Sequence, residues 1–182
     1  GILGYSAVQT GAAFLPLTVL IILVAPIAGK TSDRVGSRWL MTVGMLLVSA
    51  QLFYFSRLDE NAAYVDLLPA FFAGGIGMGL VMTPSAAAAV RALPVDKSGV
   101  GSAVLNAFRQ VGGSMGIALM GAIMAHQIGG LKGPEVFRDP SRFVDGFSTS
   151  LLVAAVIALG GAVVSFVLVR PHELEEPDRR PE

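Results

Sequence analysis

The sequence predicts an all-α fold, a polytopic transmembrane helical bundle, on three observations. Hydrophobic residues make up 53% of the 182 positions and charged residues only 14%, whereas soluble domains carry about 25% charged residues. The charges are gathered in short segments that separate long uncharged runs. Glycine, at 22 residues, suits the close helix packing that is found in lipid.

Five runs are long enough to cross a hydrocarbon core about 30 Å thick, which takes roughly 20 apolar residues. Arg109, in the fourth run, is the one charge inside them. Buried helices of a large soluble protein are the alternative, but five such runs in a chain this short favour membrane crossings. We therefore expect a transmembrane domain over residues 9–169, with spans at about 9–29, 39–56, 67–90, 99–125 and 147–169.

The positive charges predict the orientation, because cytoplasmic loops of membrane proteins carry an excess of Lys and Arg. One side of the predicted spans holds eight of them: Lys30, Arg34, Arg38, Arg91, Lys97, Arg170, Arg179 and Arg180. The other side holds four: Arg57, Lys132, Arg138 and Arg142. We expect the first side, with a charged tail at 170–182, to be cytoplasmic, in a cell (inner or plasma) membrane. Residues 1–8 then form the extracytoplasmic end of a preceding helix, which implies a missing N-terminal half.

The predicted connection between the first two spans carries a loop motif. Its glycines, its acid and its bases stand at fixed spacing: Gly29, Asp33, Arg34, Gly36 and Arg38. Gly36 permits a tight turn with positive φ, and the charged groups can pair with the ends of neighbouring helices. The pattern resembles the loop signature of the major facilitator superfamily, although Thr31 and Ser37 are not its usual residues. The resemblance implies a gating loop that latches two helices during alternating access.

Two further stretches are similar to the fourteen-helix drug:proton antiporter branch of that superfamily. The first is Gly4-Tyr5-Ser6-Ala7 with Gly11 and Leu15-Pro16, and the second is Asn106 to Gly116. The third span lacks an internal Arg and the fourth lacks a Gly-Pro pair, both of which the N-terminal half of that family carries. The resemblance therefore implies the C-terminal half of a major facilitator fold.

Arg109 is the most informative single residue, because a charge within a span costs about 2.5–3.5 kcal/mol on insertion scales. Such a charge should face a cavity or a partner, unless it snorkels to the cytoplasmic interface. Helical spacing puts five polar side chains on one broad face, which we expect to line the pathway: Ser102, Asn106, Arg109, Gln110 and Ser114.

Small residues predict helix packing rather than chemistry. The two GxxxG patterns are Gly75 with Gly79 and Gly112 with Gly116, and such patterns let helices approach closely. The chain has no cysteine, and His126 and His172 form no metal constellation, so neither a metal nor another cofactor is expected. A net charge of zero gives no reason to expect a nucleic-acid partner.

None of the acidic residues falls inside a predicted span. A proton-coupled antiporter needs a membrane carboxylate, so the resemblance implies that the missing half supplies it. We expect a fragment of a secondary active transporter that exports drugs or other amphipathic small molecules in exchange for protons. A nutrient or metabolite carrier and a non-transporting membrane scaffold are the alternatives. An intramembrane enzyme is not expected, because the spans hold no Ser-His or paired-Asp arrangement.

Overall fold

A computed structural model describes residues 7–58, 63–91, 94, 97–128 and 140–169. Within those ranges the chain forms helices and no strands, which confirms the all-α prediction. In chain order they are α1 (Ala7–Ala13), α2 (Leu15–Val35), α3 (Ser37–Phe55), α4 (Tyr64–Arg91), α5 (Ser98–Ile128) and α6 (Pro140–Leu168). The predicted tail 170–182 and most of the predicted N-terminal segment 1–8 lie outside the described residues.

The short helix α1 continues into α2 with one irregular residue between them. Pro16 has no N–H for the carbonyl of Ala12, and the chain compensates at Phe14. The N–H of Phe14 donates to the carbonyl of Gly11 at 3.2 Å, and the N–H of Thr18 donates to the carbonyl of Phe14 at 3.1 Å. The first predicted span, 9–29, therefore covers most of α1 and the first two thirds of α2.

Four helices are long and apolar enough to cross a membrane: Gly11–Val35, Ser37–Phe55, Tyr64–Val90 and Phe143–Leu168. This confirms the prediction of a multi-pass membrane bundle. Helix α5 has 31 residues, more than a bilayer needs, but it is not among these four. Its crossing, the fourth predicted span, stays a prediction.

The helices extend beyond the predicted spans, because a helix ends where its backbone hydrogen bonding ends and not where charges begin. Helix α2 continues through the predicted basic turn as far as Val35. Helices α4 and α6 begin before the predicted third and fifth spans. Asp33, Asp66 and Asp145 lie near the ends of helices long enough to cross, beyond the bounds of the predicted spans. The expectation that every acid lies outside the spans stays a prediction.

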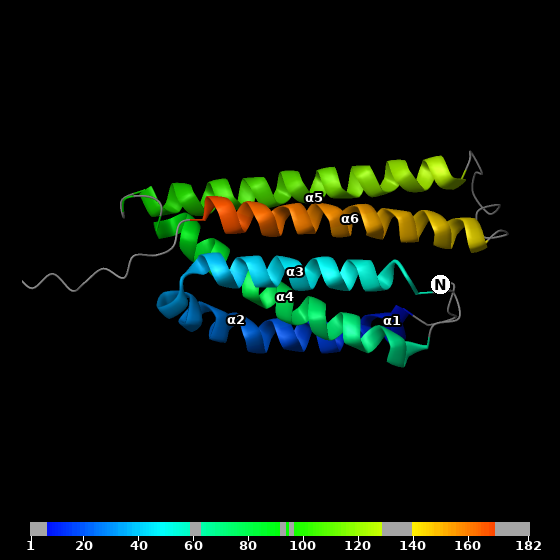
Figure 1. Cartoon of the computed structure of the whole chain (residues 1–182), viewed down its shortest axis with the longest axis horizontal. Coiled ribbons are helices and arrows are strands. Elements are labelled where there is room, and N and C mark those ends of the chain that lie inside the picture. Colours follow the sequence, from blue (N-terminus) through cyan, green and yellow to red (C-terminus); the bar gives the residue numbers. More distant parts are fainter. Residues whose placement is uncertain (1–6, 59–62, 92–93, 95–96, 129–139, 170–182) are drawn as a thin grey trace, which may run out of the picture.

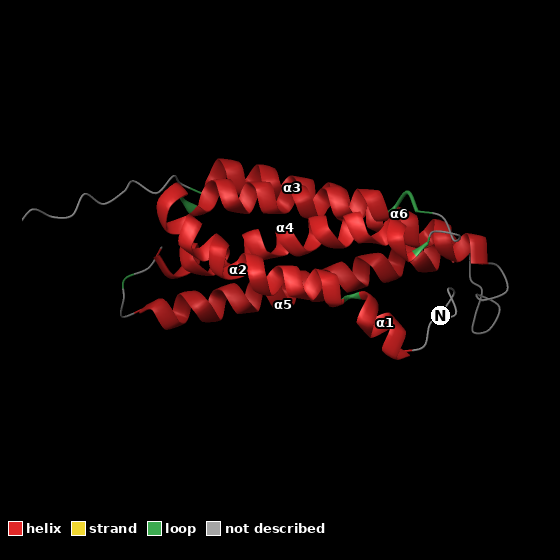
Figure 2. Ribbon diagram, turned by 90° about the horizontal axis from the view of Figure 1, so that it is seen from below, coloured by secondary structure: helices red, strands yellow, loops and turns green. Residues whose placement is uncertain are grey.

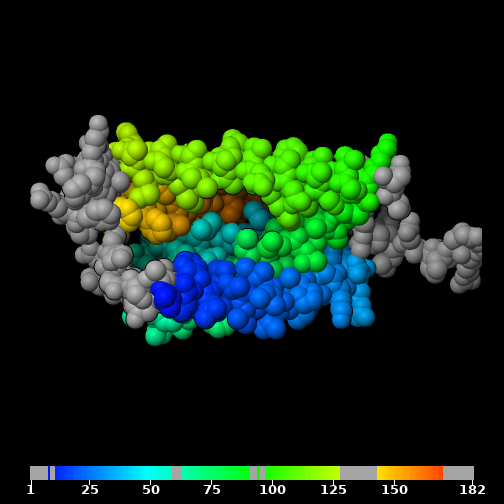
Figure 3. All heavy atoms as spheres, turned by 180° about the vertical axis from the view of Figure 1, so that it is seen from behind, coloured from blue at the N-terminus to red at the C-terminus, as the bar shows by residue number. Residues whose placement is uncertain are grey.

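Consecutive helices from α2 to α6 run antiparallel (Figure 1), and all of them lie roughly along one direction when seen from below (Figure 2). Their order in space differs from their order in the chain. Helix α3 packs against α4 and α6, α2 packs against α4, and α5 packs against α6 and more lightly against α4. The resulting arc α2–α4–α3–α6–α5 leaves a hollow between its two end helices, α2 and α5 (Figure 3).

Glycines of α4 let two helices approach its backbone from different sides. A Cβ at Gly75 would lie 2.7 Å from the Cβ of Leu20 and 2.8 Å from the carbonyl oxygen of Leu17, both on α2. A Cβ at Gly77 would lie 2.8 Å from the carbonyl oxygen of Gly44 on α3. Real side chains do not come this close, so α4 fits between α2 and α3 because these positions lack a Cβ.

Serine hydroxyls connect α3 to α6 at two levels. Ser49 donates its hydroxyl hydrogen to the carbonyl of Ala155 at 2.8 Å, and Ser148 donates to the carbonyl of Ser56 nearer the other end of α3. Hydrogen bonds of this kind contribute about 0.6 kcal/mol each between membrane helices. The centre of the arc is therefore held by close glycine packing and by interhelical hydrogen bonds.

Candidate functional site

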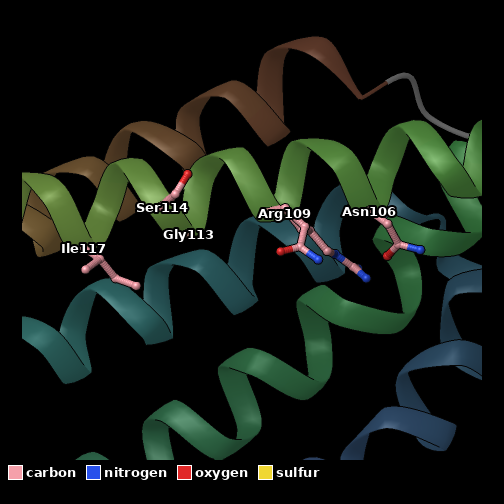
Figure 4. Close-up of a pocket in the computed structure, with 6 residues that line it drawn as sticks. Asn106, Arg109, Gly113, Ser114 and Ile117 are labelled. Atoms are coloured by element: carbon pink, nitrogen blue, oxygen red, sulfur yellow. The ribbon is translucent and has the colours of Figure 1, made fainter.

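One face of α5 lines a groove, and side chains of that face are drawn in Figure 4. The lining residues are Asn106, Arg109, Gln110, Gly113, Ser114 and Ile117. Four of the five side chains that the sequence predicts for the pathway are therefore brought together by the structure. Ser102, the remaining one, does not line the groove; its hydroxyl donates to the carbonyl of Ser98 at 3.3 Å, within the same helix.

The groove has a volume of about 600 Å³, which is within the range of about 300–1,000 Å³ that is typical of small-molecule sites. It opens toward the hollow between α5 and α2, where the surface of the molecule is recessed (Figures 3 and 4). Three of its six lining residues offer uncharged polar groups, two are apolar or glycine, and one is a cation. This mixture suits a ligand that is apolar in part and polar in part.

Arg109 reaches across from α5 to α4 (Figure 4). Its Nη2 donates to the hydroxyl of Ser85 at 2.9 Å and to the backbone carbonyl of Met82 at 3.2 Å. Both acceptors are neutral oxygens. The guanidinium is thus held against α4, although Arg109 is exposed.

The opposite face of α5 is apolar and exposed. Its side chains are between 47% and 72% exposed and recur at helical spacing: Val104, Phe108, Val111 and Met115. At 100° per residue this stripe lies about 180° around the helix from Asn106, Gln110, Gly113 and Ile117. A helix with one polar and one apolar exposed face suits a place between a polar cavity and lipid.

The two GxxxG pairs differ in their surroundings. On α4, both glycines lie against α2: Gly75 packs on that helix, and a Cβ at Gly79 would lie 2.8 Å from the side chain of Val24, which is also on α2. On α5, Gly112 and Gly116 have no atom of the described chain within 4 Å of the position of a Cβ. The structure therefore gives no packing partner within this chain for the second pair, and its packing role stays a prediction.

The predicted gating loop is a joint of one residue, Gly36. With φ 87° and ψ 150°, Gly36 is the one residue of the described chain with positive φ, in a region of backbone conformation that only glycine adopts without strain. Its N–H donates to the carbonyl of Ser32 at 3.0 Å. Beneath it, the buried hydroxyls of Ser32 and Ser37 share a hydrogen bond of 2.8 Å, which ties the end of α2 to the start of α3.

The other members of the loop signature lie on different sides of this joint. Gly29 is inside α2, where a Cβ would lie 3.1 Å from the side chain of Thr83 on α4. Asp33 and Arg34 are exposed in the last turn of α2. The guanidinium carbon of Arg38 lies 4.1 Å from the ring centroid of Phe166 on α6, a cation–π contact. Between them, these positions bring α2, α3, α4 and α6 together at one end of the bundle.

Two partners of the predicted site were not found by sequence reasoning. Ser85 and the carbonyl of Met82 precede Arg109 by more than twenty residues and lie on another helix. A hydroxyl next to Pro84 was the available signal, because prolines in membrane helices leave backbone groups that nearby polar side chains satisfy. Which side chain would reach that point depends on how α4 and α5 pack, and the sequence does not specify this directly.

Comparison with known sequences matches the whole chain to one protein family. The sequence model of the Major Facilitator Superfamily matches residues 1–182. An uncharacterized MFS-type transporter of Bacillus subtilis, YcnB, is 32% identical over 171 residues, which are 94% of this chain and 36% of that protein. The puromycin resistance protein of Streptomyces alboniger is 33% identical over 178 residues, which are 93% of this chain and 35% of that protein.

A third relative is named for both resistance and export. The tetracenomycin C resistance and export protein of Streptomyces glaucescens is 34% identical over 136 residues, which cover 75% of this chain and 24% of that protein. The chain thus spans about a third or less of the length of these relatives.

Proposed function

The chain belongs to the Major Facilitator Superfamily, and from this premise we propose that it forms part of a transporter that exports drugs or other amphipathic small molecules. The superfamily is one of membrane transporters and not of enzymes. Two relatives that are 33% and 34% identical to this chain over the aligned residues are named for resistance to puromycin and for resistance to and export of tetracenomycin C. These names support a drug as the substrate.

The observation that carries the proposal is the groove on α5. A charge on a membrane helix is costly unless it faces a cavity or a partner, and Arg109 lies in a groove beside the amides of Asn106 and Gln110. The opposite face of the same helix is apolar and exposed. We infer that α5 separates lipid from a substrate pathway, and that the hollow between α5 and α2 is the part of that pathway that this chain contributes.

Proton coupling and gating complete the proposal. The acids Asp33, Asp66 and Asp145 lie near helix ends, so the carboxylate that exchanges protons in mid-membrane comes from the part of the transporter outside this chain. Gly36 and the charges beside it act as the latch of the gate on the cytoplasmic side. The excess of Lys and Arg on that side supports this orientation.

Export by the full-length protein tests the proposal. A drug-susceptible bacterium that expresses the gene in its natural extent should tolerate at least about fourfold more tetracenomycin C, the compound named for one relative, than the same host without it, and should accumulate less drug. Arg109→Gln should abolish the protection, because it removes the charge but keeps a polar side chain of similar reach. Arg57→Gln is the matched control: its guanidinium lies over the ring of Phe53, 4.9 Å from the centroid, away from the groove.

The amount of each variant in the membrane is measured in parallel, so that loss of export is separated from loss of protein. Full protection by Arg109→Gln at an equal amount of protein would contradict the pathway role. Increased accumulation of the compounds in cells that express the unaltered protein would show uptake, and would favour a nutrient or metabolite carrier over an exporter.

A further inference from the structure

Beside the groove, the guanidinium of Arg109 on α5 meets two polar groups of α4, the hydroxyl of Ser85 and the carbonyl of Met82. Ser85 donates its hydroxyl hydrogen to the carbonyl of Met82 at 2.9 Å, while both oxygens accept from Nη2 of Arg109. Ser85 therefore accepts from the arginine and donates to the carbonyl that the arginine also contacts. The guanidinium is held at one point of α4 by two neutral oxygens.

The site on α4 lies next to a proline inside the continuous helix, Pro84. Pro84 is fully buried and lacks the N–H that would donate to the carbonyl of Leu80. The hydrogen bonds of Ser85 and Arg109 are made one turn away from the proline, to the carbonyl of Met82. Ser85 thus offers Arg109 a hydroxyl and a carbonyl at the same point of α4.

Neutral oxygens are weaker acceptors for a guanidinium than an anionic oxygen is. A carboxylate or phenolate forms charge-assisted hydrogen bonds that are roughly twice as strong, and a carboxylate can bind two guanidinium nitrogens at once. Nε and Nη1 of Arg109 have no hydrogen-bond partner among the described residues. None of the six lining residues is acidic. The described part of the groove therefore favours a negatively charged ligand over a positively charged one.

Resting on the function proposed above, we propose that the groove binds amphipathic compounds that carry an anionic oxygen, and that Ser85 holds Arg109 on α4 until such a compound takes it. Asn106 and Gln110 add amide donors on the same face, and Ile117 and Gly113 leave room for an apolar ring. Ser85 is a positioning residue, since it acts on the ligand through Arg109.

The two positions of the arginine compete, and this gives the proposal a distinctive consequence. Binding an anion at Arg109 requires its contacts with Ser85 and Met82 to be given up. A competing contact multiplies the apparent affinity for the ligand by the fraction of time that the side chain is free of that contact. Removing the Ser85 hydroxyl should therefore tighten binding, whereas a purely structural hydroxyl would weaken it or have no effect.

Two dyes with related rings test this in the purified full-length protein. Fluorescein is an anion at neutral pH, and tetramethylrhodamine methyl ester is a cation with a similar ring system. By fluorescence anisotropy, the unaltered protein should bind fluorescein more tightly than the cation. Arg109→Gln should weaken fluorescein binding by about tenfold or more, as expected for loss of a charged hydrogen-bond partner. Ser85→Ala should strengthen it by about threefold to tenfold.

The controls separate positioning from structure. Ser85→Thr keeps the hydroxyl and should bind fluorescein as the unaltered protein does. In the double variant Arg109→Gln with Ser85→Ala, the gain caused by Ser85→Ala should disappear, because the two residues act on one contact. Binding of the cationic dye should change less than twofold in all of these variants.

Three results would overturn the inference: tighter binding of the cation than of fluorescein, no binding of either dye, or no gain in fluorescein affinity from Ser85→Ala. The outcome is distinct from that of the export test, because dye binding to purified protein needs no transport. If export depends on Arg109 while Ser85→Ala leaves fluorescein affinity unchanged, the positioning role fails and the proposed function stands. If the dye pattern is found but no compound is exported, the proposed function fails instead.

Discussion

Helices α4 and α5 carry the same sequence pattern, two glycines four residues apart, in opposite surroundings. Around Gly75 and Gly79 the side chains of α2 fill the space that a Cβ would take, and Gly77 between them is filled equally closely by α3. Around Gly112 and Gly116 the described chain leaves that space empty. A small-residue pattern therefore shows that a helix can be approached closely, but it does not tell which helix, or which chain segment, approaches it.

The difference extends to the polar side chains. In the packed part of the arc, two serine hydroxyls bond between helices: Ser49 donates to the carbonyl of Ala155 and Ser148 to the carbonyl of Ser56. On α5 the hydroxyls of Ser102 and Ser114 donate to carbonyls of their own helix, and Asn106, Arg109 and Gln110 line the groove. Hydroxyls in the packed region therefore stabilise the contact between α3 and α6, whereas the polar side chains that line the groove are available to a ligand.

The largest effect should come from filling the packed glycine. Gly75→Ala places a Cβ against the backbone of α2 and should lower the free energy of unfolding by about 1–3 kcal/mol, the usual range for overpacking. Gly112→Ala is the matched substitution on α5. It should leave the unfolding free energy unchanged or raise it slightly, since alanine favours helix by about 1 kcal/mol over glycine. Unfolding of the purified full-length protein, followed by circular dichroism in detergent, compares the two, and equal losses would contradict the contrast between the helices.

Gly36 tests a different requirement for glycine, its backbone conformation and not the space around its Cα. Gly36→Ala should cost about 1–2 kcal/mol, because a side chain at positive φ collides with the backbone. Gly160→Ala on α6 is the control, because nothing lies within 4 Å of a Cβ there and its φ is not in the positive range. The same unfolding measurement checks both, and a Gly36→Ala variant as stable as Gly160→Ala would show that the joint between α2 and α3 does not require glycine.

The smallest effect concerns the hydroxyls. Ser49→Ala should lower the free energy of unfolding by about 0.6 kcal/mol, the average for a hydrogen bond between membrane helices. Ser114→Ala should cost less, because its hydrogen bond lies within one helix and competes with the backbone bond that is already there. A larger loss of stability from Ser114→Ala than from Ser49→Ala would contradict the claim that hydroxyls between α3 and α6 stabilise the fold more than those of α5.

The sequence predicted the helices better than their ends or their partners. Long uncharged runs predict crossings, because the thickness of the bilayer sets their length. The helices continue past the predicted spans and include charges near their ends, such as Asp66 and Asp145. The positive φ expected at Gly36 is confirmed, because a local motif specifies a local backbone conformation.

The composition of the groove could be predicted and its contacts could not. Helical periodicity alone puts Asn106, Arg109 and Gln110 on one face, and the structure places all three in the groove. The hydrogen bond from Arg109 to Ser85 depends on how two helices pack, and periodicity within one helix carries no information about that. The same reason explains why Phe166 was not expected beneath the guanidinium of Arg38.

The central claim is that α5 has one face toward an aqueous pathway and the other toward lipid, and cysteine scanning of α5 tests it most directly. The chain contains no cysteine, so single cysteines at 106, 110, 113 and 117 can be compared with single cysteines at 104, 108, 111 and 115 without background from this chain. In native membranes, a charged maleimide should modify the first set at least about tenfold faster, because thiolates form and react in water and not in hydrocarbon. Equal rates at the two sets, or faster reaction at 104, 108, 111 and 115, would contradict the claim.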